Sequence, residues 1–566
     1  LRRYQYRLAE VGASGPARAL GEAFAESSSR YPRPSVSPDG RWALLPRYQP
    51  DRQPTWAQRY PQVADAAARY GPGALQDPLQ YYSRPYSYVA RRLVAVRLDD
   101  GQEQAVFDAP DDTLPGGSQL RPDRLWRADG ASVLIAGTYL PPDGDALAST
   151  SPHIVEYWPD TGRWRVVAEL KTRLMGAWPV AGRGDAIDAL DGGTRRRFVR
   201  DADEGWREVE AADGGDAWAL RIDEALNQPP DIVAAGPDGR SVRLTDLNPQ
   251  YTPLAWGTMR PYAWRDAKGR TWDGGLMLPA AYDRTARHAL VIQTYGFSPT
   301  RFYLDGSNLF NGFTSGFAGR AFLREGVLVL AMPWGATTDS PADEHEAIGA
   351  FADGVDAAIE ALVAEGLIDR SRVGIIGWSA TGERVLNLLT FSDAPIRAAS
   401  ILDGDANTLY SMTVTYAVKD GIQRRKEQTN QGGPFGAALQ RWIRNDPSLH
   451  TDCVRAALRI ESYGPLVQNN WDVYALLRRQ YKPAEMVVIP GGAHALSRPA
   501  ERLLSLQGHV DWFTFWLQGR ERTDLMLPGE TAADLQAQYA RWRQMVELKR
   551  ADEARPRCDR MAEGGS

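Results

Sequence analysis

Residues 372–382 read RVGIIGWSATG, and this stretch decides the fold of the second half of the chain. The apolar run over residues 373–377 predicts a buried strand, and residues 383–389 have the spacing of a helix. Ser379 lies between them, where a sharp turn from strand to helix would raise its hydroxyl above the edge of a sheet. The stretch therefore predicts a nucleophile elbow with Ser379 as the nucleophile. The alternative is an ordinary strand–turn–helix connection that carries an inert serine.

The glycines around Ser379 depart in one place from the usual elbow sequence, Gly-x-Ser-x-Gly. Gly377 stands two residues before the serine, but Thr381 occupies the second glycine position and Gly382 follows one residue later. Small residues are needed there because the strained backbone is crowded by its neighbours. The elbow is therefore predicted from its strand-and-helix context more than from the motif itself.

Strand-like and helix-like runs alternate on both sides of this stretch. Predicted strands cover residues 289–294, 327–332, 398–402, 457–461 and 486–490, and predicted helices cover residues 348–365, 473–480 and 503–517. Such alternation is typical of a parallel sheet that is covered by helices on both faces. We therefore predict a multi-domain α and β protein in which residues 256–566 form an α/β-hydrolase domain.

Residues 1–255 show a different pattern, of short β-type runs separated by turn sequences. SPDG at residues 37–40, DG at 129–130 and PDG at 237–239 each precede such a run. Asp-Gly pairs supply the positive φ angles that hairpin turns require. Their recurrence, with Trp in several repeats, favours a β-propeller-like domain over a β-sandwich. An alanine-rich piece at residues 17–25 is expected to be helical.

A general base is sought after Ser379, because hydrolases of this fold carry serine, acid and histidine in that order. The histidines that follow are His450, His494 and His509. His494 stands in a glycine-rich loop directly after the predicted strand 486–490, and ligand sites of α/β proteins gather at such strand ends. We predict His494 as the base. A loop histidine without a catalytic role is the alternative.

The acid should lie between Ser379 and His494, at the end of a strand. Glu461 ends the predicted strand 457–461 and is favoured, because a carboxylate there would orient the imidazole and stabilise its protonated form. Asp472 is the second candidate, although its place at the start of a predicted helix suits a capping role. Asp403 and Asp405 are more distant alternatives.

An oxyanion hole needs two donors aimed at the tetrahedral oxygen. The backbone N–H of Ala380, directly after the nucleophile, is one predicted donor. Tyr295 follows the predicted strand 289–294, and its hydroxyl is a candidate for the second. Residue chemistry alone leaves open whether Tyr295 is instead a buried tyrosine in a turn.

Composition restricts the partners and the compartment. The 566 residues carry a net charge of −5 without a Lys/Arg block, so no nucleic-acid partner is expected. No apolar run reaches the roughly 18–20 residues of a membrane helix. Cys453 and Cys558 are the two cysteines, so we expect no disulfide framework and no structural zinc site. The low cysteine count also fits a cytoplasmic location, with the periplasm left open. No cofactor is expected.

The chain resembles the prolyl oligopeptidase family of serine peptidases. The resemblance rests on the recurring Asp-Gly turns of the first part, with SPDG at residues 37–40, on the Tyr-Gly pair at Tyr295, on Gly-Trp-Ser at Ser379 and on Gly-Gly-Ala-His at His494. It implies a β-propeller followed by an α/β-hydrolase domain, a peptide substrate, and a role for Tyr295 in the oxyanion hole. The Arg-Gly-Gly-Gly stretch of many members is replaced here by MPWGA at residues 332–336.

Within that family the chain looks most like the lasso peptide isopeptidases, which open the macrolactam ring of a threaded peptide. A glutamate at position 461 in place of the usual aspartate, the Tyr-Gly-Phe loop and the degenerate propeller suggest this branch. No Glu-Glu pair occurs in the chain, which argues against a dipeptidyl peptidase. The alternatives are a peptidase for short linear peptides and an inactive hydrolase that binds a partner.

Overall fold

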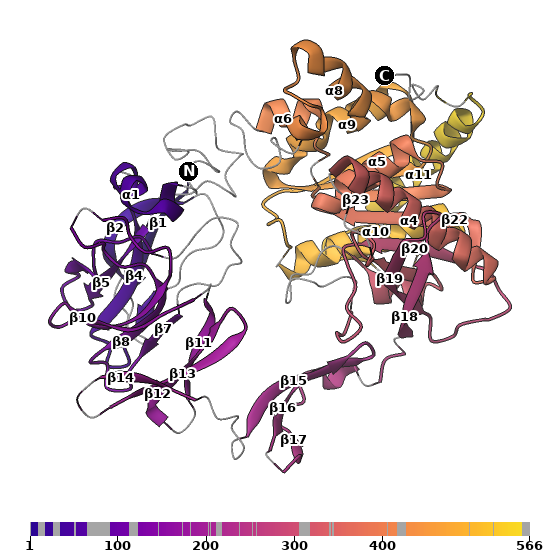
Figure 1. Cartoon of the computed structure of the whole chain (residues 1–566). Coiled ribbons are helices and arrows are strands. Elements are labelled where there is room, and N and C mark those ends of the chain that lie inside the picture. The colour runs from indigo at the N-terminus through magenta and orange to yellow at the C-terminus, as the bar shows by residue number, and fades with distance from the viewer. Residues whose placement is uncertain are drawn as a thin grey trace. The chain divides into compact units, whose positions relative to one another are not determined.

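The computed structural model describes the chain except residues 1, 9–16, 27–33, 50–51, 65–90, 112–122, 145, 172–173, 181–182, 202, 204, 211–217, 237, 252, 256, 305–316, 339–340, 342–343, 405, 416–425, 497, 524–525, 557 and 559–566. Two compact units form, and the main division along the chain falls between Asp216 and Ala217. Figure 1 shows sheets in the first unit, and a large mixed sheet with helices in the second.

An eight-stranded sheet is the centre of the second unit. Its strands are β18 (Thr258–Arg265), β19 (Thr271–Leu278), β20 (His288–Thr294), β21 (Leu328–Met332), β22 (Ile368–Trp378), β23 (Ile396–Leu402), β24 (Ala457–Tyr463) and β25 (Ala484–Ile489). They lie in the order β18-β19-β21-β20-β22-β23-β24-β25. β19 runs antiparallel to both of its neighbours, and the strands from β21 to β25 are parallel. This is the strand arrangement of an α/β-hydrolase, and the predicted strands of this half are confirmed.

Helices cover both faces of this sheet. The longer ones are α4 (Glu344–Ala364), α5 (Ala380–Phe391), α9 (Trp471–Arg479), α10 (Pro499–Gln518) and α11 (Ala532–Glu553). Shorter elements are α3 (Gly319–Arg324), α6 (Leu409–Thr415), α8 (Leu439–Asn445) and the 3₁₀ segments η3 (Pro249–Tyr251), η4 (Gly436–Ala438), η5 (Pro447–Cys453) and η6 (Gly464–Asn470). Phe351 of α4 and Leu386 of α5 are buried in the core on one face, and Trp512 of α10 and Trp542 of α11 in the core on the other.

The close fit of α10 against the sheet depends on a glycine in β22. A Cβ atom at Gly374 would lie 2.6 Å from the ring of Phe513. A methyl group there would therefore push α10 away from the strand that leads to Ser379.

The first unit contains a β-hairpin and three antiparallel sheets. The hairpin joins β1 (Arg2–Leu8) and β2 (Arg18–Glu26). The first sheet contains β3 (Ser35–Val36), β4 (Trp42–Tyr48), β5 (Arg91–Arg97) and β6 (Glu103–Ala105). The second contains β7 (Asp123–Trp126), β8 (Val133–Thr138), β9 (His153–Trp158) and β10 (Arg163–Glu169). The third contains β11 (Leu174–Val180), β12 (Arg183–Asp191), β13 (Thr194–Arg200) and β14 (Trp206–Val209). Four strands that are consecutive in the chain make up each sheet, as in a propeller blade. The propeller itself stays a prediction.

The helix expected at residues 17–25 is wrong, since this segment is strand β2, paired antiparallel with β1. Alanine prefers helices by only a fraction of a kcal/mol per residue, and pairing with a neighbouring strand overrides so weak a preference. The helix near this part of the chain is instead α1 (Gln53–Arg59), which has a proline in its first turn.

The division between the units comes earlier than the predicted boundary at residue 255. A three-stranded sheet of β15 (Ala219–Ala225), β16 (Gln228–Ala235) and β17 (Ser241–Arg243) accounts for the difference. Asn227 in the turn between β15 and β16 exchanges two hydrogen bonds of 2.9 and 2.7 Å with the backbone of Met259. Arg320 donates to the carbonyl of Leu226 at 3.1 Å. These bonds attach the small sheet to β18 and α3 of the second unit.

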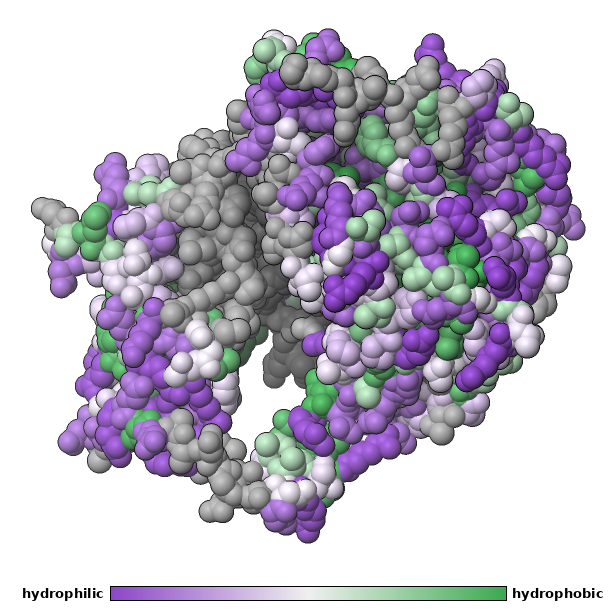
Figure 2. Space-filling view, turned by 45° about the vertical axis from the view of Figure 1, so that its right-hand side comes forward, coloured by the Kyte–Doolittle hydropathy of each residue, from purple (hydrophilic) through white to green (hydrophobic). Residues whose placement is uncertain are grey.

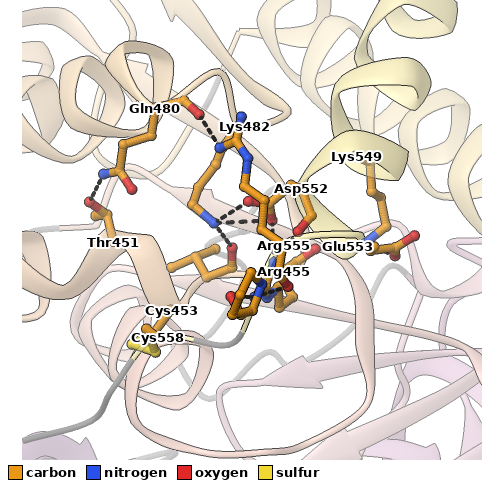
Figure 3. Close-up of polar contacts among 12 residues, drawn as sticks. Thr451, Cys453, Arg455, Gln480, Lys482, Lys549, Asp552, Glu553, Arg555 and Cys558 are labelled. Atoms are coloured by element: carbon orange, nitrogen blue, oxygen red, sulfur yellow. Dashed lines mark hydrogen bonds and ion pairs between the residues drawn. A yellow bond between two sulfur atoms is a disulfide. The ribbon is translucent and has the colours of Figure 1, made fainter.

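A single disulfide joins Cys453 and Cys558, although no disulfide framework was expected from two cysteines. The pairing could not be seen in the sequence because 105 residues separate the two cysteines. Figure 3 shows the bond beside a group of polar contacts between α11 and the segments that precede β24 and β25. Lys482 and Asp552, both nearly fully buried, form an ion pair of 2.9 Å at the centre of that group.

None of the helices in the described ranges is long and apolar enough to cross a membrane. Figure 2 shows one face of the molecule, where the described residues are mainly hydrophilic and the hydrophobic ones occur in small scattered groups.

Candidate active site

Ser379 occupies the turn between β22 and α5, as predicted. β22 ends at Trp378 and α5 begins at Ala380, so the serine is the single residue between strand and helix. Its φ of 55° and ψ of −128° fall in a region that residues other than glycine rarely adopt. Such strain is what a nucleophile elbow shows, because the sharp turn holds the hydroxyl out from the sheet.

Crowding around the elbow explains its departure from Gly-x-Ser-x-Gly. A Cβ atom at Gly377 would lie 2.6 Å from the carbonyl oxygen of Thr381, and one at Gly382 would lie 3.1 Å from the Cα of Gly404. The hydroxyl of Thr381 accepts from the N–H of Trp378 at 2.9 Å and donates to its carbonyl at 2.8 Å. Thr381 thus closes the turn with its side chain, and the close approach to β23 falls on Gly382 instead.

His494 lies against Ser379. Its Nε2 is 2.8 Å from the serine Oγ, and its Nδ1 is 2.7 Å from Oδ2 of Asp403. The histidine stands in the loop between β25 and α10, where the sequence predicted it. The imidazole side chain is about half exposed, whereas the Asp403 side chain is 1% exposed. Serine, histidine and a buried carboxylate therefore form one continuous line of hydrogen bonds.

Asp403 is the partner of His494 and corrects the expectation that Glu461 would be. It follows directly on β23 with a φ of 38°, and its other oxygen, Oδ1, accepts from the N–H of Tyr463 at 2.6 Å. Its own N–H donates to the carbonyl of Glu461 at 2.6 Å. Burial raises the pKa of Asp403, and the contacts with His494 and Tyr463 act in the opposite direction. The carboxyl is thus held by backbone bonds to the neighbouring strand β24.

Glu461 lies on β24 but its carboxylate points into the core on the α10 side. Tyr463 donates to it at 3.0 Å, Arg459 at 3.2 Å, and Ser505 of α10 also donates to it. Burial opposes its ionisation, but nearby positive charge and these hydrogen bonds outweigh burial and lower the pKa of Glu461. Side chains alternate along a strand, so Glu461 cannot face His494 while it takes part in this network.

The other acid candidates do not reach His494 either. Asp472 lies in the first turn of α9 and is largely buried, which raises its pKa. Asp405 lies outside the described residues. A signal for Asp403 was present in the sequence, since it comes directly after a predicted strand, but its left-handed backbone conformation could not be read from residue types.

Of the two predicted oxyanion residues, Ala380 follows the serine in the chain and Tyr295 packs on Trp378, the residue before it. Ala380 is the first residue of α5, and the N–H groups of a first helical turn have no acceptor within the helix. Tyr295 directly follows β20 and is 5% exposed, with its ring centroid 4.8 Å from Trp378 and 4.9 Å from Trp334. The indole N–H of Trp334 donates to the carbonyl of Tyr295 at 2.8 Å.

The other two histidines after the serine have structural contacts. His450 bonds through Nε2 to the carbonyl of Ile443 at 3.0 Å. His509 is fully buried in α10, with Nε2 2.8 Å from the Ser400 hydroxyl and Nδ1 2.6 Å from the carbonyl of Ser505.

Metal-ligating side chains gather in one place within the described part of the chain. Asp452, Cys453 and Cys558 bring one ligand atom each within 4.8 Å of one another. The two sulfur atoms are joined in the disulfide and are not thiolates, so these residues do not fit a metal ion in this state.

An α/β-hydrolase sheet with a Ser–His–Asp line at its strand ends is the arrangement of a serine hydrolase. No protein-family profile matches the chain. The lasso peptide isopeptidase AtxE2 of Asticcacaulis excentricus is 29% identical to it over 196 residues, which are 34% of this chain and 26% of that protein. The matched part thus spans about a quarter of that relative's length.

Solved structures of similar fold cover most of the chain. A variant of the AtxE2 isopeptidase with Astexin3-dC4 bound has a TM-score of 0.54 at 18% identity, covering 97% of this chain and 84% of that one. The acylaminoacyl peptidase of Pyrococcus horikoshii has a TM-score of 0.52 at 15% identity, covering 92% and 86%. The fold is shared, and the chain is similar to serine peptidases of the prolyl oligopeptidase family.

Proposed function

We propose that the protein is a serine peptidase in which Ser379 is the nucleophile, His494 the general base and Asp403 the acid. The observation that carries this proposal is the unbroken line from the Ser379 hydroxyl through both imidazole nitrogens to a buried carboxylate, with contacts of 2.8 and 2.7 Å. A carboxylate on Nδ1 keeps the proton there and leaves Nε2 free to accept the serine proton.

The reaction proceeds through an acyl-enzyme. His494 Nε2 takes the proton of Ser379 as the serine oxygen attacks the amide carbon, and the C–N bond breaks as the same proton passes to the leaving amine. Water then attacks the ester carbon and gives a proton to His494, and the Ser379–acyl bond breaks as that proton passes to the serine oxygen, which releases the carboxylic acid. Asp403 stays ionised throughout and stabilises the imidazolium that forms in each half-reaction.

The developing oxyanion is held by the N–H of Ala380 and by the hydroxyl of Tyr295 in this proposal. Ala380 supports it through its position at the start of α5, where the helix dipole also favours negative charge. Tyr295 supports it through its place at the end of β20, next to the strand that carries Ser379.

The substrate we propose is a lasso peptide, whose macrolactam isopeptide bond the enzyme hydrolyses to give the linear peptide. The similarity to AtxE2 supports this choice, since that relative is a lasso peptide isopeptidase and has been seen with Astexin3-dC4 bound. An isopeptide bond is an amide, so the chemistry is unchanged. The likeness in fold to an acylaminoacyl peptidase keeps a linear peptide as the second candidate.

We further propose that the sheets β3–β6, β7–β10 and β11–β14 are blades of a β-propeller. Their four-stranded antiparallel make-up supports this reading.

The disulfide also bears on the compartment, since such bonds persist in oxidising surroundings and are rare in the cytosol. We therefore favour an oxidising compartment such as the periplasm over the cytoplasm predicted from the sequence. To test this, free thiols are alkylated in intact cells of the native host, and the cells are then separated into periplasmic and cytoplasmic fractions. Complete alkylation of Cys453 would support the cytoplasmic location instead.

The experiment treats the purified protein and two variants with a threaded lasso peptide, a linear peptide and a fluorophosphonate probe. Ser379→Ala removes the nucleophile, and Ser371→Ala, an exposed serine of the same strand, is the matched control. We expect wild type and Ser371→Ala to take up the probe and to add the mass of one water to the lasso peptide, and Ser379→Ala to do neither.

Each other result has a defined meaning. Cleavage of the linear peptide with an intact lasso peptide supports the second candidate. Probe labelling without cleavage of either peptide supports the serine mechanism and contradicts both proposed substrates. A wild type that the probe does not label contradicts the serine mechanism and supports an inactive hydrolase that binds a partner.

A further inference from the structure

Trp378, the residue directly before the nucleophile, contacts His494 in two ways. The indole is stacked on the imidazole, with ring centroids 4.8 Å apart and an angle of 24° between the planes. Its Nε1–H also donates to the backbone carbonyl of His494 at 3.1 Å. One side chain thus contacts both the ring face and the backbone of the proposed base, although the two residues are 116 positions apart in the sequence.

Trp378 is itself held firmly. It is the last residue of β22 and is 6% exposed, and the hydroxyl of Thr381 bonds both its N–H and its carbonyl. The ring of Tyr295 packs on it at 4.8 Å. A rigid strand end therefore provides the surface on which His494 rests.

The imidazole of His494 is weakly restrained by its own loop and by its two hydrogen-bond partners. It stands in a loop that begins with two glycines, one of which, Gly491, has a φ of 78°, and its side chain is about half exposed. Its two nitrogens hold the ring at two points, on Asp403 and on Ser379, which leaves rotation of the ring about the line between these points weakly restrained. Contact on the face of the ring restrains that rotation.

We propose that Trp378 is a positioning residue for the reaction, which keeps His494 in the plane that joins Ser379 and Asp403. This inference rests on the proposed serine mechanism. The stack and the hydrogen bond make separable contributions. The stack fixes the plane of the imidazole, while the bond from Nε1 fixes the loop backbone from which the imidazole extends. The same indole packs on Tyr295, so Trp378 sets the distance between the proposed base and the proposed oxyanion donor.

Two substitutions separate these contributions. Trp378→Phe keeps an aromatic face and loses the Nε1–H donor, and Trp378→Leu loses both. Trp471→Leu is the control for loss of a tryptophan, because Trp471 is half exposed on α9 and contacts the ring of Tyr474. Circular dichroism and thermal unfolding identify any variant that fails to fold.

The first readout is the rate with a substrate that the wild type cleaves. We expect kcat of Trp378→Leu to fall about 10²-fold, the loss that a misplacement of about 1 Å produces. KM should change little, and Trp378→Phe should keep kcat within roughly tenfold of wild type, the equivalent of one hydrogen bond. Trp471→Leu should match wild type. A folded Trp378→Leu with wild-type kcat would overturn the inference.

The second readout needs no substrate. The proton on Nδ1 of His494, held by Asp403, should give a far-downfield resonance in the wild-type NMR spectrum that Asp403→Asn removes. In Trp378→Leu the resonance should broaden or vanish, and in Trp378→Phe it should persist. An unchanged resonance in Trp378→Leu contradicts the inference, even if the wild type proves inactive on peptides. Failure of the serine mechanism is a different result, which is recognised when the fluorophosphonate probe does not label the wild type.

Discussion

Oδ2 of Asp403 lies 2.7 Å from Nδ1 of His494, and the aspartate reaches the histidine from the end of β23, one strand before the position predicted for the acid. Asp403 can do so because its N–H and one carboxylate oxygen are bonded to the backbone of β24, at Glu461 and Tyr463. The acid of the site is therefore held by the strand that carries the residue first expected to be the acid.

Asp403→Asn should lower kcat on the order of 10⁴-fold with little change in KM, because an amide on Nδ1 favours the wrong imidazole tautomer. The fold should persist, since an asparagine oxygen can still accept from the N–H of Tyr463. Steady-state kinetics measure the effect. Wild-type kcat in Asp403→Asn would remove Asp403 from the mechanism.

Glu461→Gln should act on stability rather than on rate. Arg459 is buried and would lose one of its two carboxylate partners, and breaking a buried ion pair costs about 3–5 kcal/mol. Urea unfolding measures the free energy of unfolding, and kcat should stay within a few-fold of wild type. Glu547→Gln, at an exposed pair with Arg550, is the control and should change stability by about 0.5 kcal/mol or less. A large fall in kcat in Glu461→Gln, without loss of stability, would support Glu461 rather than Asp403 as the acid of the site.

Thr381→Val should destabilise the elbow by about 1–3 kcal/mol, because the N–H of Trp378 loses its acceptor in a buried place and the two side chains have nearly the same shape. Thermal unfolding measures this, with Thr381→Ser, which keeps the hydroxyl, as the control. Equal stability of the Val and Ser variants would show that the hydroxyl does not close the turn.

Stability should fall when the pH drops below about 6.5. Burial lowers the pKa of His509 to about 4, against 6.5 for the unfolded chain, so the unfolded state takes up the proton first as the pH falls. Between these values the loss approaches on the order of 3 kcal/mol. Urea unfolding from pH 7.5 to 4.5 should show this slope in wild type and in His345→Gln, an exposed histidine of α4, and a smaller slope in His509→Gln. Equal slopes in all three proteins would contradict the assignment.

Cys453→Ser should lower the free energy of unfolding by up to about 4–5 kcal/mol, because the disulfide closes a loop of about a hundred residues in the unfolded chain. The same loss should appear when wild type is unfolded with a reductant, and the reductant should have no further effect on Cys453→Ser. The ion pair of Lys482 with Asp552 stays in both cases, so α11 should remain folded. Wild-type unfolding that is insensitive to the reductant would show that the disulfide does not form.

Much of the second unit could be predicted because local patterns determine it. A buried strand, a helix and a strained turn between them are all contained in residues 372–389, so Ser379 was identified without any distant contact. His494 was found for a similar reason, since the glycine-rich loop after a strand is a local signal. β2 is the opposite case, where the local preference of alanine was overruled by pairing with β1.

The sequence by itself determined that a serine elbow and a loop histidine stand at the strand ends of an α/β sheet. The tertiary structure alone decided that Asp403 faces His494 while Glu461 faces Arg459, that Trp378 supports the imidazole, and that Cys453 meets Cys558. Each of these is a contact between residues far apart in the chain or a choice between two faces of one strand. Such contacts depend on how strands line up and which way each side chain points, and a list of residue types does not contain that information.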